Sequence, residues 1–232
     1  MKQIKDTPFL KSPFDDDKLH EECAVYGIFG TKDASAHTAL GLHAMQHRGQ
    51  EASGILTYDG KTFHVHRALG LVGDNFSSNS IISELGGKSA IGHNRYSTTG
   101  GAALRNVQPM FAELNTGGFG VCHNGNLTNA EYLRGQLIKE GAIFQSTSDT
   151  EVIIHLIAKS SYTTFLDRFI DALRHVEGAY SLIALTPKGL IGVRDPLGVR
   201  PMVLGQLEDG VHILASETCA FDIIGAKYVR DI

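Results

Sequence analysis

The sequence lacks the features that mark membrane, secreted and nucleic-acid-binding proteins. No apolar run approaches the roughly 18 residues of a membrane-spanning helix, and residues 1–22 are polar and acidic, unlike a signal peptide. The formal net charge of −4 provides no basic surface for nucleic acid. We therefore expect a cytoplasmic protein with no nucleic-acid partner and no membrane partner.

Cysteine is scarce and widely spaced. The cysteines are Cys23, Cys122 and Cys219. This odd number forms neither a disulfide framework nor the paired spacing of a metal site. His43, His93 and His123 also lack the ligand spacing of a zinc site, which favours structural roles for them. The sequence thus predicts no metal in this chain.

Cys23 stands directly before an apolar, strand-like run at residues 24–29. A thiol with a pKa of about 8.5 is only partly ionised at neutral pH, so a catalytic cysteine needs a base. If residues 1–22 were removed, the new terminal amine of Cys23, with a reference pKa of roughly 7.7 to 8.0, could take the thiol proton. The structural alternative is a small buried residue at the start of a strand.

The order of predicted elements indicates an α+β protein with antiparallel sheets covered by helices. The 26 glycines are typical of many strands joined by tight turns. Strands are predicted at residues 24–29, 54–58, 62–67, 89–93, 118–122, 180–186, 190–193 and 211–215. Helices are predicted at 35–46, 128–140, 152–158 and 164–174, with a short one from 217. We see one domain after residue 22.

Local polar residues predict how some of these elements begin and end. Residues 123–126 follow a strand and are expected to form a turn. Thr128 is expected to cap the helix that follows. Ser148 and Glu151 stand at the spacing of a capping box for the next helix.

Four polar stretches, three of which contain glycine, occur in order after Cys23. They are HRGQEASG (47–54), GHNRYSTTG (92–100), HNGN (123–126) and SDTE (148–151). Together with RDPLGVRP (194–201) and ASETCA (215–220), they resemble the class II glutamine amidotransferase domain, an N-terminal-nucleophile (Ntn) hydrolase. This resemblance implies a four-layer αββα sandwich of two mostly antiparallel sheets. RYSTTG followed by NVQP (106–109) looks most like the amino-terminal half of the amidophosphoribosyltransferases.

The resemblance implies catalytic roles for three residues. Cys23 would attack the side-chain amide of glutamine and form a glutamyl thioester, which water then hydrolyses. The Asn124 side chain and the Gly125 backbone N–H would stabilise the oxyanion. The structural alternative for these last two residues is a hairpin turn.

The resemblance also implies a substrate clamp. Arg95, assisted by the Thr98 hydroxyl, would bind the α-carboxylate of L-glutamine, and Asp149 would bind its α-ammonium. Arg48 would order the loop over the nucleophile and reach toward the substrate. The alternatives are a surface ion pair for Arg95 and a helix cap for Asp149.

The expected organisation is a propeptide at 1–22 and a glutaminase domain at 23–232, without the C-terminal phosphoribosyltransferase domain of the family. That domain would use phosphoribosyl pyrophosphate (PRPP), Mg²⁺ and, in the propeptide-bearing branch, a [4Fe-4S] cluster. The ammonia would serve 5-phosphoribosylamine synthesis in purine biosynthesis, in a homo-oligomer. The alternatives are a glucosamine-phosphate synthase type of amidotransferase, an amidase for another amide, and a non-catalytic glutamine-binding module.

Overall fold

The computed structural model describes residues 22–96 and 103–232. The strands are β1 Ala24–Phe29, β2 Ala52–Tyr58, β3 Phe63–Leu69, β4 Ser89–Arg95, β5 Met110–Leu114, β6 Gly117–Leu127, β7 Gly178–Thr186, β8 Gly189–Arg194, β9 Val203–Gln206, β10 His212–Ala215 and β11 Lys227–Asp231. The α-helices are α1 Ala34–Ala44, α2 Val72–Phe76, α3 Asn79–Glu84, α4 Ala130–Lys139, α5 Thr150–Lys159, α6 Phe165–Leu173 and α7 Cys219–Asp222. Two 3₁₀ turns are η1 Gln46–Arg48 and η2 Leu104–Asn106. Within this described part of the chain, no helix is long and apolar enough to cross a bilayer.

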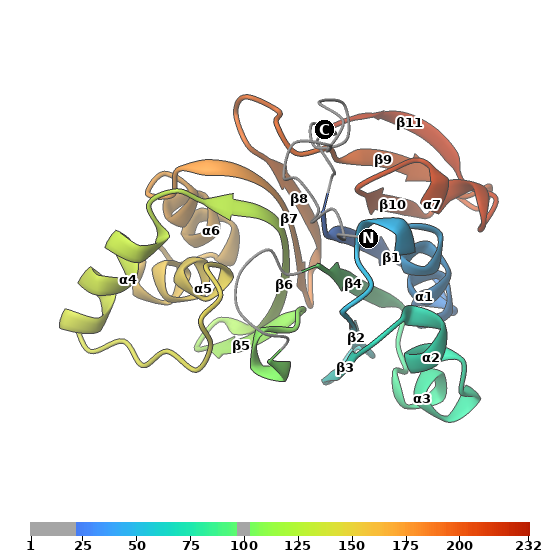
Figure 1. Cartoon of the computed structure of the whole chain (residues 1–232), viewed down its shortest axis with the longest axis horizontal. Helices are drawn as coiled ribbons and strands as arrows, with labels where there is room; N and C mark the ends of the chain where they lie inside the picture. Colours follow the sequence, from blue (N-terminus) through green and yellow to red (C-terminus); the bar gives the residue numbers. More distant parts are fainter. Residues whose placement is uncertain (1–21, 97–102) are drawn as a thin grey trace, which may run out of the picture.

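Two sheets lie face to face between two layers of helices (Figure 1). The larger sheet has the strand order β11-β9-β10-β1-β4-β2-β3, and the smaller has the order β5-β6-β7-β8. Each described pairing between strands is antiparallel. The predicted α+β class and four-layer αββα sandwich are therefore confirmed.

Apolar side chains fill the three spaces between the four layers of helices and sheets, because side chains alternate along each strand. Successive strand residues point to opposite faces of a sheet. In β1, Tyr26 packs with Leu42 of α1, whereas Val25 packs with Ile183 of the other sheet. A third cluster packs the outer face of the smaller sheet against α4, α5 and α6. Apolar side chains thus pack on both faces of each sheet.

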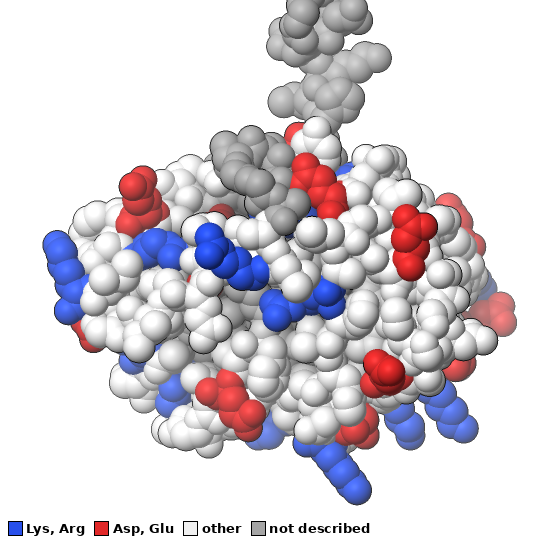
Figure 2. All heavy atoms as spheres, turned by 60° about the horizontal axis from the view of Figure 1, so that its bottom comes forward, with Lys and Arg blue, Asp and Glu red and all other residues white. Residues whose placement is uncertain are grey.

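Charged side chains of both signs are spread over the surface. On the face turned forward in Figure 2, acidic and basic side chains are interspersed, and several basic ones lie near its centre. This distribution fits the small formal net charge of −4.

Three local predictions are wrong. Residues 123–126 do not form a turn, because β6 continues through them to Leu127 and pairs with β7. The helix after β6 begins after Asn129 rather than Thr128. The capping box does not form either, because the carboxylate of Glu151 accepts the N–H groups of Gln145 and Ser146 instead.

The register of β1 and β4 places the predicted site residues together. Ala24 pairs with Asn94 in these antiparallel neighbours. Cys23, just before β1, and Arg95, the last residue of β4, therefore lie at the same edge of the larger sheet. These predicted site residues therefore lie together where β1 begins and β4 ends.

Candidate active site

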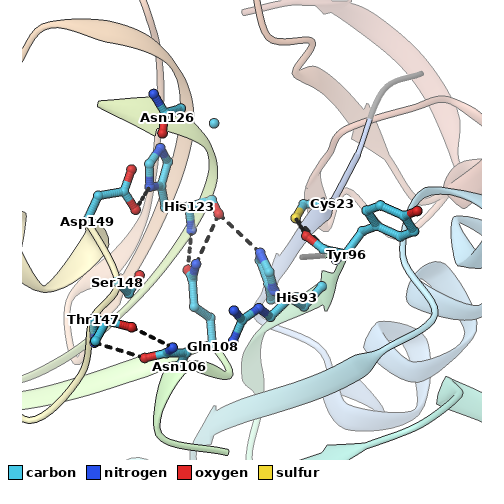
Figure 3. Close-up of a pocket in the computed structure, with 12 residues that line it drawn as sticks. Cys23, His93, Tyr96, Asn106, Gln108, His123, Asn126, Thr147, Ser148 and Asp149 are labelled. Carbon is cyan, nitrogen blue, oxygen red and sulfur yellow. Dashed lines mark hydrogen bonds and ion pairs between the residues drawn. The ribbon is translucent and has the colours of Figure 1, made fainter. Parts of the chain in front are cut away.

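A polar pocket of about 230 Å³ opens where β1 begins and β4 ends (Figure 3). Its described lining includes Cys23, Arg95, Gly125 and Asp149. Pockets for drug-sized ligands occupy roughly 300 to 1,000 Å³. The smaller volume and polar lining suit a compact polar metabolite.

The backbone and thiol of Cys23 are held in an unusual position. Its φ is 64°, in the left-handed region that residues other than glycine rarely adopt. The Tyr96 N–H donates to Cys23 Sγ at 3.4 Å, and the thiol donates to the Tyr96 carbonyl at 3.5 Å. Burial raises the pKa of the Cys23 thiol, although the Tyr96 hydrogen bond and the charges of Arg95 and Arg200 act against this rise. The burial of this thiol therefore works against its ionisation.

Arg48 binds both the backbone N–H and the backbone carbonyl of Cys23. The Cys23 N–H donates to the Arg48 carbonyl at 2.7 Å, and Arg48 Nε donates to the Cys23 carbonyl at 2.7 Å. Arg48 is only 2% exposed and is not among the described residues that line the pocket. It thus lies behind Cys23.

Asn124 and Gly125 lie on β6, near its carboxyl end. By alternation, Asn124 shares the face of Cys122, which packs between the two sheets. Among the described residues, the buried Nδ2 of Asn124 has no hydrogen-bond partner. Gly125 has a φ of +148°, and a Cβ there would stand 2.1 Å from the Ala179 carbonyl oxygen, so only glycine fits.

A hydrogen-bonded network fixes this part of β6 to the larger sheet. His93 Nε2 and Gln108 Nε2 lie 3.1 and 3.2 Å from the His123 carbonyl oxygen. Gln108 Oε1 accepts the His123 N–H at 2.6 Å. Burial lowers the pKa of His93 to about 3, so its ring stays neutral at physiological pH. The network holds the backbone that leads into Asn124.

Asp149 presents a carboxylate on the opposite side of the pocket from Cys23 (Figure 3). Its Oδ2 accepts the Leu127 N–H at 3.0 Å, and its Oδ1 lies 3.4 Å from His123 Nδ1. Burial raises the pKa of Asp149, but His123 and the Leu127 N–H outweigh this effect and hold it at about 2. The side chain does not cap α5. It remains an anion at neutral pH and faces the cavity.

Arg95 supplies the positive charge of the pocket. Its Nη1 is buried and has no hydrogen-bond partner among the described residues. A buried guanidinium nitrogen that lacks a partner is costly, so this nitrogen favours an anionic ligand in the pocket. Arg95 and Asp149 give one cavity a fixed cation and a fixed anion.

The structure brings four of the seven predicted site residues into one pocket. Cys23, Arg95, Gly125 and Asp149 line one pocket, and Asn124 adjoins it on β6. Thr98 lies outside the described residues, as does the segment 1–21 of the expected propeptide.

Sequence reasoning assigned no site role to two residues that the structure connects to the site. His123 was expected to be structural, yet its ring contacts the Asp149 carboxylate. Glu217 is bound by Arg48. The signal for Glu217 was its place in ASETCA, a stretch that resembled the family without a specified role.

The four-layer fold, with a cysteine at the start of a central strand and a polar pocket beside it, is that of an Ntn-hydrolase domain. Residues 93–222 match the family model described as "Glutamine amidotransferase domain", which is more than half of the chain. The chain belongs to this glutamine amidotransferase family.

Curated relatives that match nearly the whole chain include amidophosphoribosyltransferases, as the resemblance implied. The chain is 59% identical over 220 residues to that of Rhizobium etli, a match that covers 95% of this chain and 44% of the relative. It is 45% identical to that of Staphylococcus aureus, covering 92% of this chain and 43% of the relative. The chain thus spans about half the length of the curated relatives it matches.

A solved structure shares the fold over most of the chain. It is the glutamine PRPP amidotransferase from B. subtilis complexed with ADP and GMP. The TM-score is 0.85 at 43% identity, and the match covers 90% of this chain and 45% of that one. The layers and site elements described above therefore belong to a fold that a solved amidotransferase shares.

Proposed function

We propose that this domain hydrolyses L-glutamine to glutamate and ammonia with Cys23 as the nucleophile. The observation that carries the proposal is one pocket lined by a thiol, an arginine with a buried unpartnered nitrogen, and a carboxylate held as an anion. A free α-amino acid carries opposite charges that complement Arg95 and Asp149. Its side-chain amide would then extend toward Cys23.

The chemistry begins with proton transfer from the Cys23 thiol to its own α-amine, once residues 1–22 are removed. The sulfur attacks the amide carbon of glutamine and forms a tetrahedral oxyanion. Asn124 Nδ2 and the Gly125 N–H are proposed to donate to this oxygen, and the donor without a partner at Asn124 supports that role. The Cys23 ammonium then returns a proton to the departing nitrogen, so that ammonia leaves and a γ-glutamyl thioester remains.

Water completes the reaction. The Cys23 amine takes a proton from the water molecule that attacks the thioester carbon. The same oxyanion donors stabilise the second tetrahedral intermediate. Its collapse breaks the C–S bond and releases glutamate, and the Cys23 ammonium returns its proton to the sulfur to regenerate the thiol. Both half-reactions thus use one base and one oxyanion site.

The charge clamp makes a prediction about specificity. Arg95→Lys removes the planar fork and Asp149→Asn removes the negative charge. Because hydrogen bonds to charged groups contribute about 1.5 to 3 kcal/mol, we expect each substitution to raise KM for glutamine about 10- to 100-fold. The measurement is ammonia release over a range of glutamine concentrations, with the exposed Arg174→Lys as the matched control.

Two glutamine analogues test whether Arg95 binds the α-carboxylate and whether Asp149 binds the α-ammonium. Arg95→Lys should leave the weak hydrolysis of 4-aminobutanamide, which lacks the α-carboxylate, unchanged. Glutaramic acid lacks the α-amine. Asp149→Asn should therefore leave the weak hydrolysis of glutaramic acid unchanged. If the wild-type protein uses glutamine and both analogues equally well, the clamp is refuted.

We further propose that the domain is the glutaminase half of an amidophosphoribosyltransferase, because its relatives of that name are about twice as long. Its ammonia would then serve 5-phosphoribosylamine synthesis from PRPP in a cytoplasmic homo-oligomer. The expected Mg²⁺ and [4Fe-4S] cluster would belong to the C-terminal half. In the same proposal, residues 1–22 are a propeptide whose removal exposes the Cys23 amine.

A further inference from the structure

Glu217 lies beside the nucleophile because of the sheet order. The strand β10 is the antiparallel neighbour of β1, and Ala215 pairs with Tyr26. Beyond the end of β10, the Ser216 N–H donates to the Val25 carbonyl at 3.0 Å. The next residue, Glu217, therefore lies alongside the start of β1, although it is 194 positions away from Cys23 in the sequence.

The Glu217 carboxylate binds the arginine that holds Cys23. Arg48 Nη1 donates to Glu217 Oε1, while His47 Nε2 lies 3.0 Å from Oε2. The Arg48 side chain is 1% exposed and that of Glu217 is 32% exposed. A guanidinium this deeply buried requires a negative partner, since an uncompensated buried charge is costly.

We propose that Glu217 is a positioning residue for the glutaminase reaction, acting through Arg48 on the placement of Cys23. The chain of contacts runs from the Glu217 carboxylate to the Arg48 guanidinium, and from Arg48 Nε to the Cys23 carbonyl. The Arg48 carbonyl accepts the Cys23 N–H, so the same arginine orients the nitrogen that becomes the base. This inference rests on the proposed function and gives the ASETCA stretch a role.

A metal site is the competing interpretation of this cluster. Ligand atoms of His47, Glu217 and Cys219 lie within 4.8 Å of one another. The Arg48 guanidinium already occupies the same carboxylate, and its positive charge opposes a cation there. The contacts therefore favour positioning over metal binding.

The test compares Glu217→Gln, Arg48→Lys and their double variant in a chain that begins at Cys23. Glu217→Gln keeps an oxygen acceptor but removes the charge, and a small misplacement of a reacting group can cost about 100-fold in rate. We expect each single substitution to lower kcat about 10- to 100-fold with KM for glutamine nearly unchanged. The double variant should lose no more than the more severe single one, because both act through the same contact. Glu208→Gln, at an exposed glutamate, is the matched control.

A second readout separates this proposal from the glutaminase assignment and from a purely structural role. The rate of Cys23 alkylation by iodoacetamide, followed by peptide mass mapping over a range of pH, reports the thiol and amine without glutamine. We expect Glu217→Gln to change this pH profile. If the wild-type chain releases no ammonia, that absence would overturn only the proposed function, and the changed profile would still support positioning. An unchanged profile and kcat with a lowered Tm would overturn the positioning role, as would multiplicative losses in the double variant.

Discussion

A chain whose first residue is Cys23 is expected to release ammonia from glutamine about 10²- to 10⁴-fold faster than the same chain with Glu22 retained, the usual contribution of a general base. With Glu22 attached, the nitrogen of Cys23 is an amide and cannot accept the thiol proton. Burial also raises the pKa of that thiol, so little thiolate forms without a base. Ammonia release by residues 22–232 and by residues 23–232 is the measurement.

Removal of Glu22 is expected to leave the position of the Cys23 nitrogen unchanged. The Cys23 N–H already donates to the Arg48 carbonyl at 2.7 Å, and a free amine keeps this acceptor. Equal Tm values for the two chains serve as the control for folding. Equal rates of ammonia release would refute the role of the amine as the base.

Asn124→Ala is expected to lower kcat about 10²- to 10³-fold with a small effect on KM for glutamine. Asn124 Nδ2 is buried and has no partner among the described residues, so it is available to an oxyanion that develops only after attack. A donor used mainly in the transition state affects kcat more than substrate binding. Steady-state kinetics of ammonia release measure both constants.

A control variant and a stability measurement accompany the kinetics of Asn124→Ala. Asn79→Ala removes an exposed asparagine at the start of α3 and should leave both constants unchanged. The stability of Asn124→Ala, measured by urea denaturation, shows whether the fold survives. A folded variant that raises KM and keeps kcat would place Asn124 in substrate binding and contradict the oxyanion role.

The sequence was sufficient for the fold class and most elements, because period-two apolar patterns and turn residues act locally. The strands predicted at 54–58 and 62–67 formed as β2 and β3, with Tyr58 paired to Phe63. The prediction of a turn at residues 123–126 was wrong for a physical reason. Its polar residues have turn-like propensities, but pairing with β7 overrides them and extends the strand.

Long-range register explains what local patterns missed at the site. Cys23 and Arg95 meet because β1 and β4 are neighbours, a fact that no short sequence window contains. The link from Glu217 to Arg48 spans 169 positions and depends on β10 lying beside β1. The family resemblance supplied candidate roles at the pocket, whereas the support behind Cys23 required the folded chain.

The most direct test of the central claim is the mass of the chain beginning at Cys23 after a brief reaction with glutamine and an acid quench. The account predicts one glutamyl group on the peptide that contains Cys23, and neither this adduct nor ammonia release in Cys23→Ala. A Cys122→Ala variant, in which a buried thiol away from the pocket is removed, should still form the adduct. Ammonia release by Cys23→Ala at the wild-type rate, with no glutamyl adduct on the wild-type chain, would contradict the account.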